Sequence, residues 1–505
     1  MLARMILMCC AIGLLWGQSF PADASGWQRA ESEHYVVHAD MSSEDLRQLM
    51  QEMEDFNQIL RQILPLEIEP GRKLELYLTP NSERISRVAS LGVSGLSVTA
   101  PDAMLAFARF DLTDPIGMKH EAPFFYAARA HLAQAVQKPV PPWLRGVSSF
   151  LATAYPLRQG HYALGAPHPA RPPGAPASIA ELQRTLTYQS EPKQQDRFER
   201  FAEVSQQIAS VVLLDPRYSG VIHRHITAYT SGASMDEAAS EFGDLTVLQK
   251  LVIKSLRTIR PSVRVIALPP SPPAEITLRP MNKAQIALID ARFKRFHSRH
   301  RAANSRQLRA LTDRFADSAL VWYEYAANEF ARVQNSEFGD DPLFRGFGFA
   351  NGELLVVANR HSDAEAWRAV NRALALDPGL AEAQCLRAEI LLNRLVRAGD
   401  IDDLEAFAQV RRLLAPLARS SAAHPLAAAL YYQSYIEQDQ PAPDIAFDQL
   451  ATAFRTNAGV LDLRYAYAVA LSRRGQADEA RSLLTSLLNS PQFAETAERA
   501  LNIAP

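Results

Sequence analysis

The sequence predicts two regions of different fold class, an α+β domain followed by an all-α domain of helical repeats. In the first region, short segments of alternating apolar residues, which are typical of strands, give way after Pro123 to longer segments with helical apolar spacing. In the second region nearly every segment has helical spacing, and small apolar residues recur about every 34 residues. A small sheet followed by helices is typical of α+β domains, and a recurring helical unit is typical of a solenoid.

The composition is that of a globular protein, and the charge sets limits on its partners. The chain has 505 residues, of which 48% are hydrophobic and 21% are charged. This balance argues against a disordered or fibrous chain. Lys and Arg number 53 against 55 Asp and Glu, a net charge of −2. Because proteins that bind nucleic acid usually have a basic excess, we expect no nucleic-acid partner.

Residues 1–24 have the pattern of a secretory signal peptide. Arg4 precedes the apolar run 5–16, and Ala22 and Ala24 place small residues where a signal peptidase requires them. The alternative is an N-terminal membrane anchor, although the run is shorter than the roughly 18 residues that span a bilayer. After cleavage we expect no stable membrane span.

Cysteine usage indicates the compartment. Cys9 and Cys10 would leave with the signal peptide, so only Cys385 would remain and no internal disulfide would form. A large exported protein without disulfides is typical of the bacterial periplasm. We therefore expect export across the inner membrane to the periplasm, with Cys385 as a small core residue in a helix.

The elements of the first domain, residues 25–260, are predicted from apolar spacing. Strands are expected at 34–38, 74–78, 95–100 and 104–110. A long helix is expected over 46–63, where apolar residues recur at steps of three and four. Further helices are expected at 124–136, 143–155, 203–214, 218–229, 235–242 and 245–259.

A proline-rich stretch over 261–280 separates the two regions. Proline at this density stops helices and favours an extended, semi-rigid path. The stretch predicts a linker over 261–280 and a second domain over 281–505. A second proline-rich segment, 165–176, is expected to be a surface loop within the first domain.

Small and apolar residues recur in equal phases in the second domain when units start at 347, 427 and 461. These residues are Ala366, Val370 and Ala373; Ala446, Leu450 and Ala453; and Ala480, Leu484 and Leu487. The pattern resembles tetratricopeptide repeats, whose units are about 34 residues long. A further unit is expected from 381, followed by an insertion, and a divergent helix is expected at 322–330. The alternative is an irregular helical bundle.

Several short motifs follow one another along residues 27–260. They are 30–38 (AESEHYVVH), 53–56 (MEDF), 74–78 (LELYL), 141–144 (PPWL), 231–233 (SGA) and 241–243 (EFG). In this order they resemble the peptidase MA-like, gluzincin-type zinc metallopeptidases that are found fused to tetratricopeptide repeats in bacteria. The resemblance implies a metallopeptidase-like fold for the first domain.

The zinc site of that family is H-E-x-x-H on one helix plus a Glu on a later helix, and the Glu of the motif is the general base. Counting back from Trp143, the resemblance places His131 at the second His. It places Ala127 at the first His and Ala128 at the base. Where the family has W-x-x-E-G, this chain has Trp143-Leu144-Arg145-Gly146, one residue short and with Arg in place of the acid. The resemblance therefore implies a relict position at His131, no catalytic residue and no bound zinc.

Two interpretations of His131 remain open. A displaced motif would combine His120, Glu121 and His131 in an altered metal site, which would make the protein a zinc-dependent peptidase. Against this, Pro123 interrupts the helix and Phe124 holds the i+4 position. Otherwise His131 is a satisfied or surface histidine.

Other catalytic motifs are missing from the sequence. It contains no P-loop, no G-x-G-x-x-G after a strand and no G-x-S-x-G elbow. His223 and His225 are two residues apart on a predicted helix, and Glu54 and Asp55 are adjacent on another. We expect each pair to diverge rather than to converge on one ligand.

The sequence thus indicates a non-catalytic binding or scaffold protein whose solenoid holds a protein or peptide partner. The residues expected on its concave surface are Tyr431, Tyr435, Gln438, Asp462, Tyr465 and Arg473. Tyr and Arg are enriched in binding hot spots, whereas tyrosines also pack between helices, and both interpretations stay open. The alternative functions are a hydrolase with an altered metal site and an inert structural spacer.

Overall fold

The computed structural model describes residues 26–503 with short gaps. The gaps are 67–70, 89–94, 102, 116–118, 137–138, 159, 166–173, 189–190, 193, 258–262, 271, 335–347, 351–352, 356–361, 421–423 and 489–492. The predicted signal peptide lies outside the described residues, as does most of the predicted loop 165–176. Among the helices of the described part, none has the length and apolar character that a membrane span requires.

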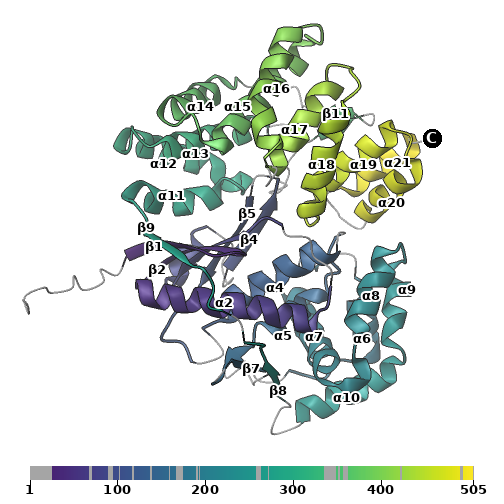
Figure 1. The fold of residues 1–505 in the computed structure, drawn as a ribbon. Coiled ribbons are helices and arrows are strands. Elements are labelled where there is room, and N and C mark those ends of the chain that lie inside the picture. Colours follow the sequence, from purple (N-terminus) through teal and green to yellow (C-terminus); the bar gives the residue numbers. More distant parts are fainter. Residues whose placement is uncertain are drawn as a thin grey trace, which may run out of the picture.

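A six-stranded sheet forms the centre of the first region (Figure 1). Its strand order is β4-β5-β3-β2-β1-β9. Strands β2, β3 and β5 are parallel to one another, β4 is antiparallel to β5, and β1 is antiparallel to both of its neighbours, β2 and β9. The strands are β1 (Gly26–Glu31), β2 (Tyr35–Met41), β3 (Leu74–Thr79), β4 (Gly95–Ala100), β5 (Ala103–Arg109) and β9 (Thr277–Pro280). Four of them match the strands expected from alternating apolar residues.

Helices α2 (Ser43–Ile63) and α4 (Glu121–Val136) cover one face of the sheet. The Ser42 side chain caps α2 by accepting from the Asp45 backbone amide, and the apolar stripe of α2 is buried. Alternate strand residues such as Leu76 share a core with this stripe. Phe56 of α2 stacks on Phe124 of α4 with ring centroids 4.1 Å apart, which fixes the two helices side by side.

The opposite face of the sheet is covered by α11 (Lys283–Lys294), the first helix of the C-terminal region, together with the short α3 (Ser82–Ser86). Phe293 of α11 is fully buried against Tyr77 and Phe107, whose ring centroids lie 5.3 and 5.2 Å away. The sheet therefore has its second apolar layer only when residues beyond 280 are folded.

The proline-rich stretch 261–280 contains two strands. The strand β8 (Arg264–Ala267) pairs with β7 (His161–Leu164) in a small sheet that also contains β6 (Tyr155–Pro156), whereas β9 pairs with β1 in the main sheet. Because β9 is an edge strand, Pro280 is tolerated there. The stretch thus runs along the α/β region, pairing with it at both ends.

The remaining helices of the first region follow β5 in the chain. They are α5 (Leu144–Leu151), α6 (Ile179–Thr187), α7 (Gln195–Leu214), the short helix η1 (Pro216–Tyr218), α8 (Val221–Thr230), α9 (Met235–Ala239), the short helix η2 (Ser240–Phe242) and α10 (Leu245–Arg257). They pack on α2 and α4 to form the largest hydrophobic core of the described chain.

The C-terminal region consists of paired helices (Figure 1). They are α11, α12 (Ser298–Arg314), α13 (Ala319–Gln334), α14 (Ala364–Leu376), α15 (Ala381–Ala398), α16 (Leu404–Ala418), α17 (Pro425–Ile436), α18 (Asp444–Thr456), α19 (Leu461–Arg473), α20 (Ala477–Leu487) and α21 (Ala494–Ile503). The fold class is therefore confirmed at the level of a mixed α/β region followed by an all-helical region of paired helices.

The residues that recur in equal phases along the sequence are buried in the helix pairs. The nine residues in equal phases on α14, α18 and α20 are all at most 1% exposed. The repeat unit expected from 347 does not begin with a helix. Its start contains the short strands β10 (Gly348–Ala350) and β11 (Glu353–Leu355) instead. Helix α14 packs instead against α13, so the stretch between them is an insertion within a pair.

Candidate functional site

Helix α4 holds the two positions where the family resemblance places the first zinc-binding His and the general base. Ala127 and Ala128 occupy them and are 2% and 0% exposed in the main core. Their methyl groups pack among the strand and α2 side chains. This part of α4 is therefore a packing surface, and a side chain as large as His has no space there.

His131 lies one turn further along α4 and is 8% exposed. Its ring forms a hydrogen bond with the Leu64 backbone at the end of α2, and its Nε2 has no partner among the described residues. Burial and the nearby Arg61 guanidinium lower the pKa of His131 to about 4. The imidazole is therefore neutral at physiological pH and is held against α2.

Arg145 of α5 contacts the other side of α4. Its guanidinium lies 5.2 Å from the Phe125 ring centroid and 5.0 Å from that of Phe198. Arg129 and Arg145 both approach the Glu191 carboxylate, at 3.7 and 3.6 Å. Successive helical residues are about 100° apart, so Phe125, six positions before His131, lies about 120° around the helix from it. The structure does not bring Arg145 and His131 together.

The alternative metal site, made of His120, Glu121 and His131, is not formed among the described residues either. His120, directly before α4, is 1% exposed, and its Nε2 lies 2.5 Å from Glu52 Oε2. Its ring stacks on Phe124 with centroids 5.1 Å apart. In the part of the chain that the structure describes, no three His, Cys, Asp or Glu residues are placed to hold a metal ion. His120, Glu121 and His131 therefore do not form one site.

The two pairs that were expected to diverge do so. His225 is fully buried, accepts from the Trp143 indole at 3.0 Å and donates to the Ala238 carbonyl at 2.9 Å, whereas His223 is exposed. Glu54 turns towards His34, whose Nδ1 is 2.7 Å away.

Asp55, the neighbour of Glu54 on α2, points away from it and accepts a hydrogen bond from the Tyr162 hydroxyl at 2.9 Å. Glu54 itself is only 8% exposed, so it belongs to a buried polar cluster. Hydrogen bonds from His34 and Ser32 lower its pKa against the opposing effect of burial.

The side chains expected on a partner surface differ widely in exposure. Tyr431, Gln438 and Tyr465 are buried, at 4%, 6% and 1% exposed. Tyr435 is half-buried, and Arg473 is exposed. The buried three take part in packing between helices rather than facing solvent.

An arginine that the sequence did not single out organises this cluster. The Arg411 guanidinium of α16 lies 3.8 Å from the Tyr435 ring centroid and donates to Gln438 at 2.6 Å. The Tyr435 and Tyr431 hydroxyls are 3.2 Å apart. Of the α17 residues expected on a partner surface, only Tyr435 is partly accessible to solvent. Arg411 of α16 stacks on its ring.

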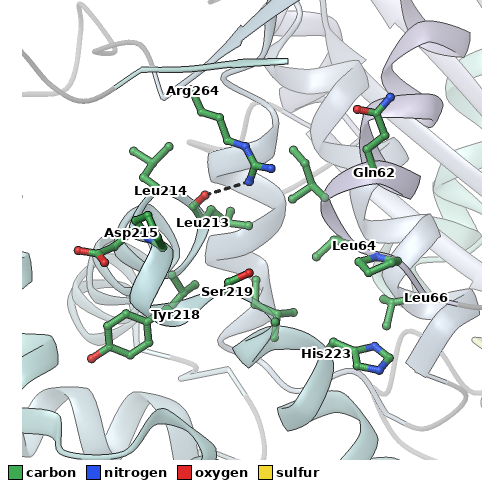
Figure 2. A pocket seen from close by; sticks show the side chains of 16 residues that line it. Gln62, Leu64, Leu66, Leu213, Leu214, Asp215, Tyr218, Ser219, His223 and Arg264 are labelled. Atoms are coloured by element: carbon green, nitrogen blue, oxygen red, sulfur yellow. Dashed lines mark hydrogen bonds between the residues drawn. The ribbon is translucent and has the colours of Figure 1, made fainter. Parts of the chain in front are cut away.

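A pocket of about 540 Å³ opens between the end of α2, the end of α7, the start of α8 and β8 (Figure 2). It is lined by 62–66, 212–216, 218–220, 222, 223 and 264. At its rim, Arg264 donates to the Leu213 carbonyl at 3.4 Å, and Asp215 pairs with Arg217 at 2.7 Å. We name it the α2–α8 pocket. No local pattern in the sequence predicts this pocket, because three segments far apart in the chain form its walls.

Comparison with models of known protein families, with curated proteins and with solved structures gives no match to this chain.

Proposed function

We propose that the protein is an exported, non-catalytic binding or scaffold protein. In this proposal a degenerate metallopeptidase-like domain is joined to tetratricopeptide-type helix pairs that hold a protein or peptide partner. The observation that carries it is the state of the expected zinc positions: Ala127 is buried in the core, His131 is held against α2, and Arg145 lies across the helix.

The chemistry of these positions opposes peptide hydrolysis by zinc. A catalytic zinc uses about three protein ligands and an open position, and its base activates the bound water. Here the base position is Ala128, and the Arg145 cation stands where the family has a carboxylate. One neutral imidazole is a weak site on its own, so we propose that neither zinc nor peptidase activity is retained.

The helix pairs support the binding part of the proposal. Helices α17 and α18 pack as one pair, and α19 and α20 pack as the next. Gly475 lies in the turn between α19 and α20 and has a φ of +74°. Stacked pairs of this kind present an extended surface to a partner. Since Tyr431 and Tyr465 are used in packing, we assign the contact surface to the exposed Arg473 and to the rim around Tyr435.

Site-specific cross-linking tests the binding part. A photoreactive benzoylphenylalanine replaces Arg473 in one variant and Arg368, an exposed residue of α14, in another. We expect a discrete cross-linked protein at position 473 and none at 368, and we expect Arg473→Glu to weaken binding of that purified partner about tenfold. Equal cross-linking at both positions, or none, contradicts the proposal and favours an inert spacer.

Peptidase assays test the catalytic part. The purified chain with added zinc is expected to leave unstructured casein intact. Cleavage that a chelator abolishes and that His131→Ala removes would establish the alternative, a zinc-dependent peptidase with an altered site.

A further inference from the structure

We propose that the α2–α8 pocket binds a small anionic molecule with an apolar body. This function is separate from the partner surface of the helix pairs and does not depend on it. Three features carry it: the volume of the pocket, the apolar side chains in its walls and the positive charge of Arg264 at its rim.

The size and walls of the pocket suit a small ligand. Its volume of about 540 Å³ lies within the range of sites for small molecules, roughly 300–1,000 Å³. Apolar side chains form part of the lining: Ile63 at the end of α2 with Leu64 and Leu66 just after it, and Val212 and Leu214 at the end of α7. Polar groups form the rest of the lining. The part of a ligand that contacts the apolar side chains is therefore expected to be apolar.

The charged groups at the rim favour an anion. Arg264 extends from β8 towards the Leu213 carbonyl, which takes one of its five N–H donors (Figure 2). The carboxylate nearest to it among the lining residues is Asp215, which is held by the Arg217 guanidinium at 2.7 and 2.9 Å. Among the described lining residues, Arg264 therefore has a neutral carbonyl as its partner and no carboxylate of its own.

Two features at the start of α8 also favour binding of an anion. His223 lines the pocket on the side away from Arg264 (Figure 2). Gly220 begins α8 without a side-chain cap, so the first backbone N–H groups of the helix are not taken by one. A carboxylate or a similar anion between Arg264 and this helix start would receive donors from both sides.

Binding of dodecanoate, an anion with an apolar chain, tests the proposal. Titration calorimetry with the purified full chain is expected to show saturable binding of about one molecule per chain. Dodecanol, which has the same chain without the charge, is expected to bind about tenfold more weakly or less. Arg264→Gln is expected to weaken dodecanoate binding by a similar factor, with partial recovery in Arg264→Lys.

A blocking variant and a distant control complete the design. Ser219→Trp places a large side chain at the exposed edge of the pocket and is expected to abolish binding, whereas Arg412→Gln is expected to have no effect. Circular dichroism checks that each variant is folded. Absence of saturable binding, equal binding of the alcohol, or binding that survives both pocket variants overturns the proposal. None of these readouts depends on the cross-linking experiment, so the two proposals fail separately.

Discussion

Replacement of Phe293 by alanine measures how firmly the helical region is joined to the sheet. Phe293 is fully buried between Tyr77 and Phe107, although it lies on the first helix after the proline-rich stretch. Truncation of a buried Phe costs about 3–5 kcal/mol in lost transfer energy and cavity formation. Two ring contacts are lost as well. We therefore expect Phe293→Ala to reduce the free energy of unfolding by about 4 kcal/mol.

Guanidinium unfolding followed by circular dichroism gives this free energy, with limited proteolysis as a second readout. Leu404→Ala is the matched control, because Leu404 is 64% exposed in the same region and its truncation should change stability by no more than about 0.5 kcal/mol. If Phe293→Ala unfolds at the same denaturant concentration as this control, α11 does not complete the sheet and the described arrangement is wrong.

Three further predictions concern buried charge, protonation and backbone shape. Glu75→Gln is expected to cost about 1.5–3 kcal/mol, because Glu75 accepts from the partly buried Arg292 at 2.8 Å and its loss leaves that guanidinium with the more distant Glu324 carboxylate, 3.4 Å away. Chemical unfolding measures the cost, and Glu44→Gln on the exposed end of α2 is the control. His131 has a pKa of about 4 when folded against about 6.5 when unfolded, so its contribution is complete above pH 6.5 and is lost as the pH falls to about 4. Relative to His131→Leu, the wild type is expected to lose about 2 kcal/mol between pH 7 and pH 4.5, measured as paired unfolding curves. Gly475→Ala forces alanine to a φ of +74° and is expected to cost roughly 1–2 kcal/mol, seen as a lower melting temperature.

Each of these results has a contrary outcome. A loss for Glu75→Gln no larger than for Glu44→Gln would mean that the ionic network is not formed. An unchanged stability difference between wild type and His131→Leu across the pH range would mean that His131 titrates normally. A Gly475→Ala protein as stable as the wild type would mean that the turn before α20 is not left-handed.

Local patterns in the sequence were enough to predict much of the fold. The apolar stripe of α2 and the alternation in β3 depend on neighbours a few residues apart, and both elements lie where they were expected. The recurring small residues of α18 and α20 were also correctly expected to be buried, because a helix crossing needs small side chains whatever lies around it. The pairing of helices was visible for the same reason.

Contacts between distant segments were not predictable in this way. The proline-rich stretch shows only that helices stop there, and nothing local indicates that β9 pairs with β1. The packing of Phe293 on Tyr77 joins residues more than 200 positions apart. The α2–α8 pocket could not be predicted for the same reason, because Leu64, Leu213 and Arg264 become neighbours only in the folded chain.

Helix α4 shows a different limit. Apolar residues surround it, so the sequence alone gives no preferred face, and a register counted from Trp143 does not say which side meets α5. The structure shows Ala127 and Ala128 in the core and Phe125 beneath Arg145. The positions that the family resemblance assigns to zinc could be numbered from the sequence, but their orientation depends on packing.

The metal content of the purified chain tests the central claim most directly. The protein is expressed with added zinc, dialysed under mild conditions and examined by elemental analysis. We expect less than about a tenth of an equivalent of zinc per chain, because the ligand positions on α4 and α5 do not converge. About one equivalent of zinc, lost in His131→Ala, would contradict the account and favour the alternative, a zinc-dependent peptidase with an altered metal site.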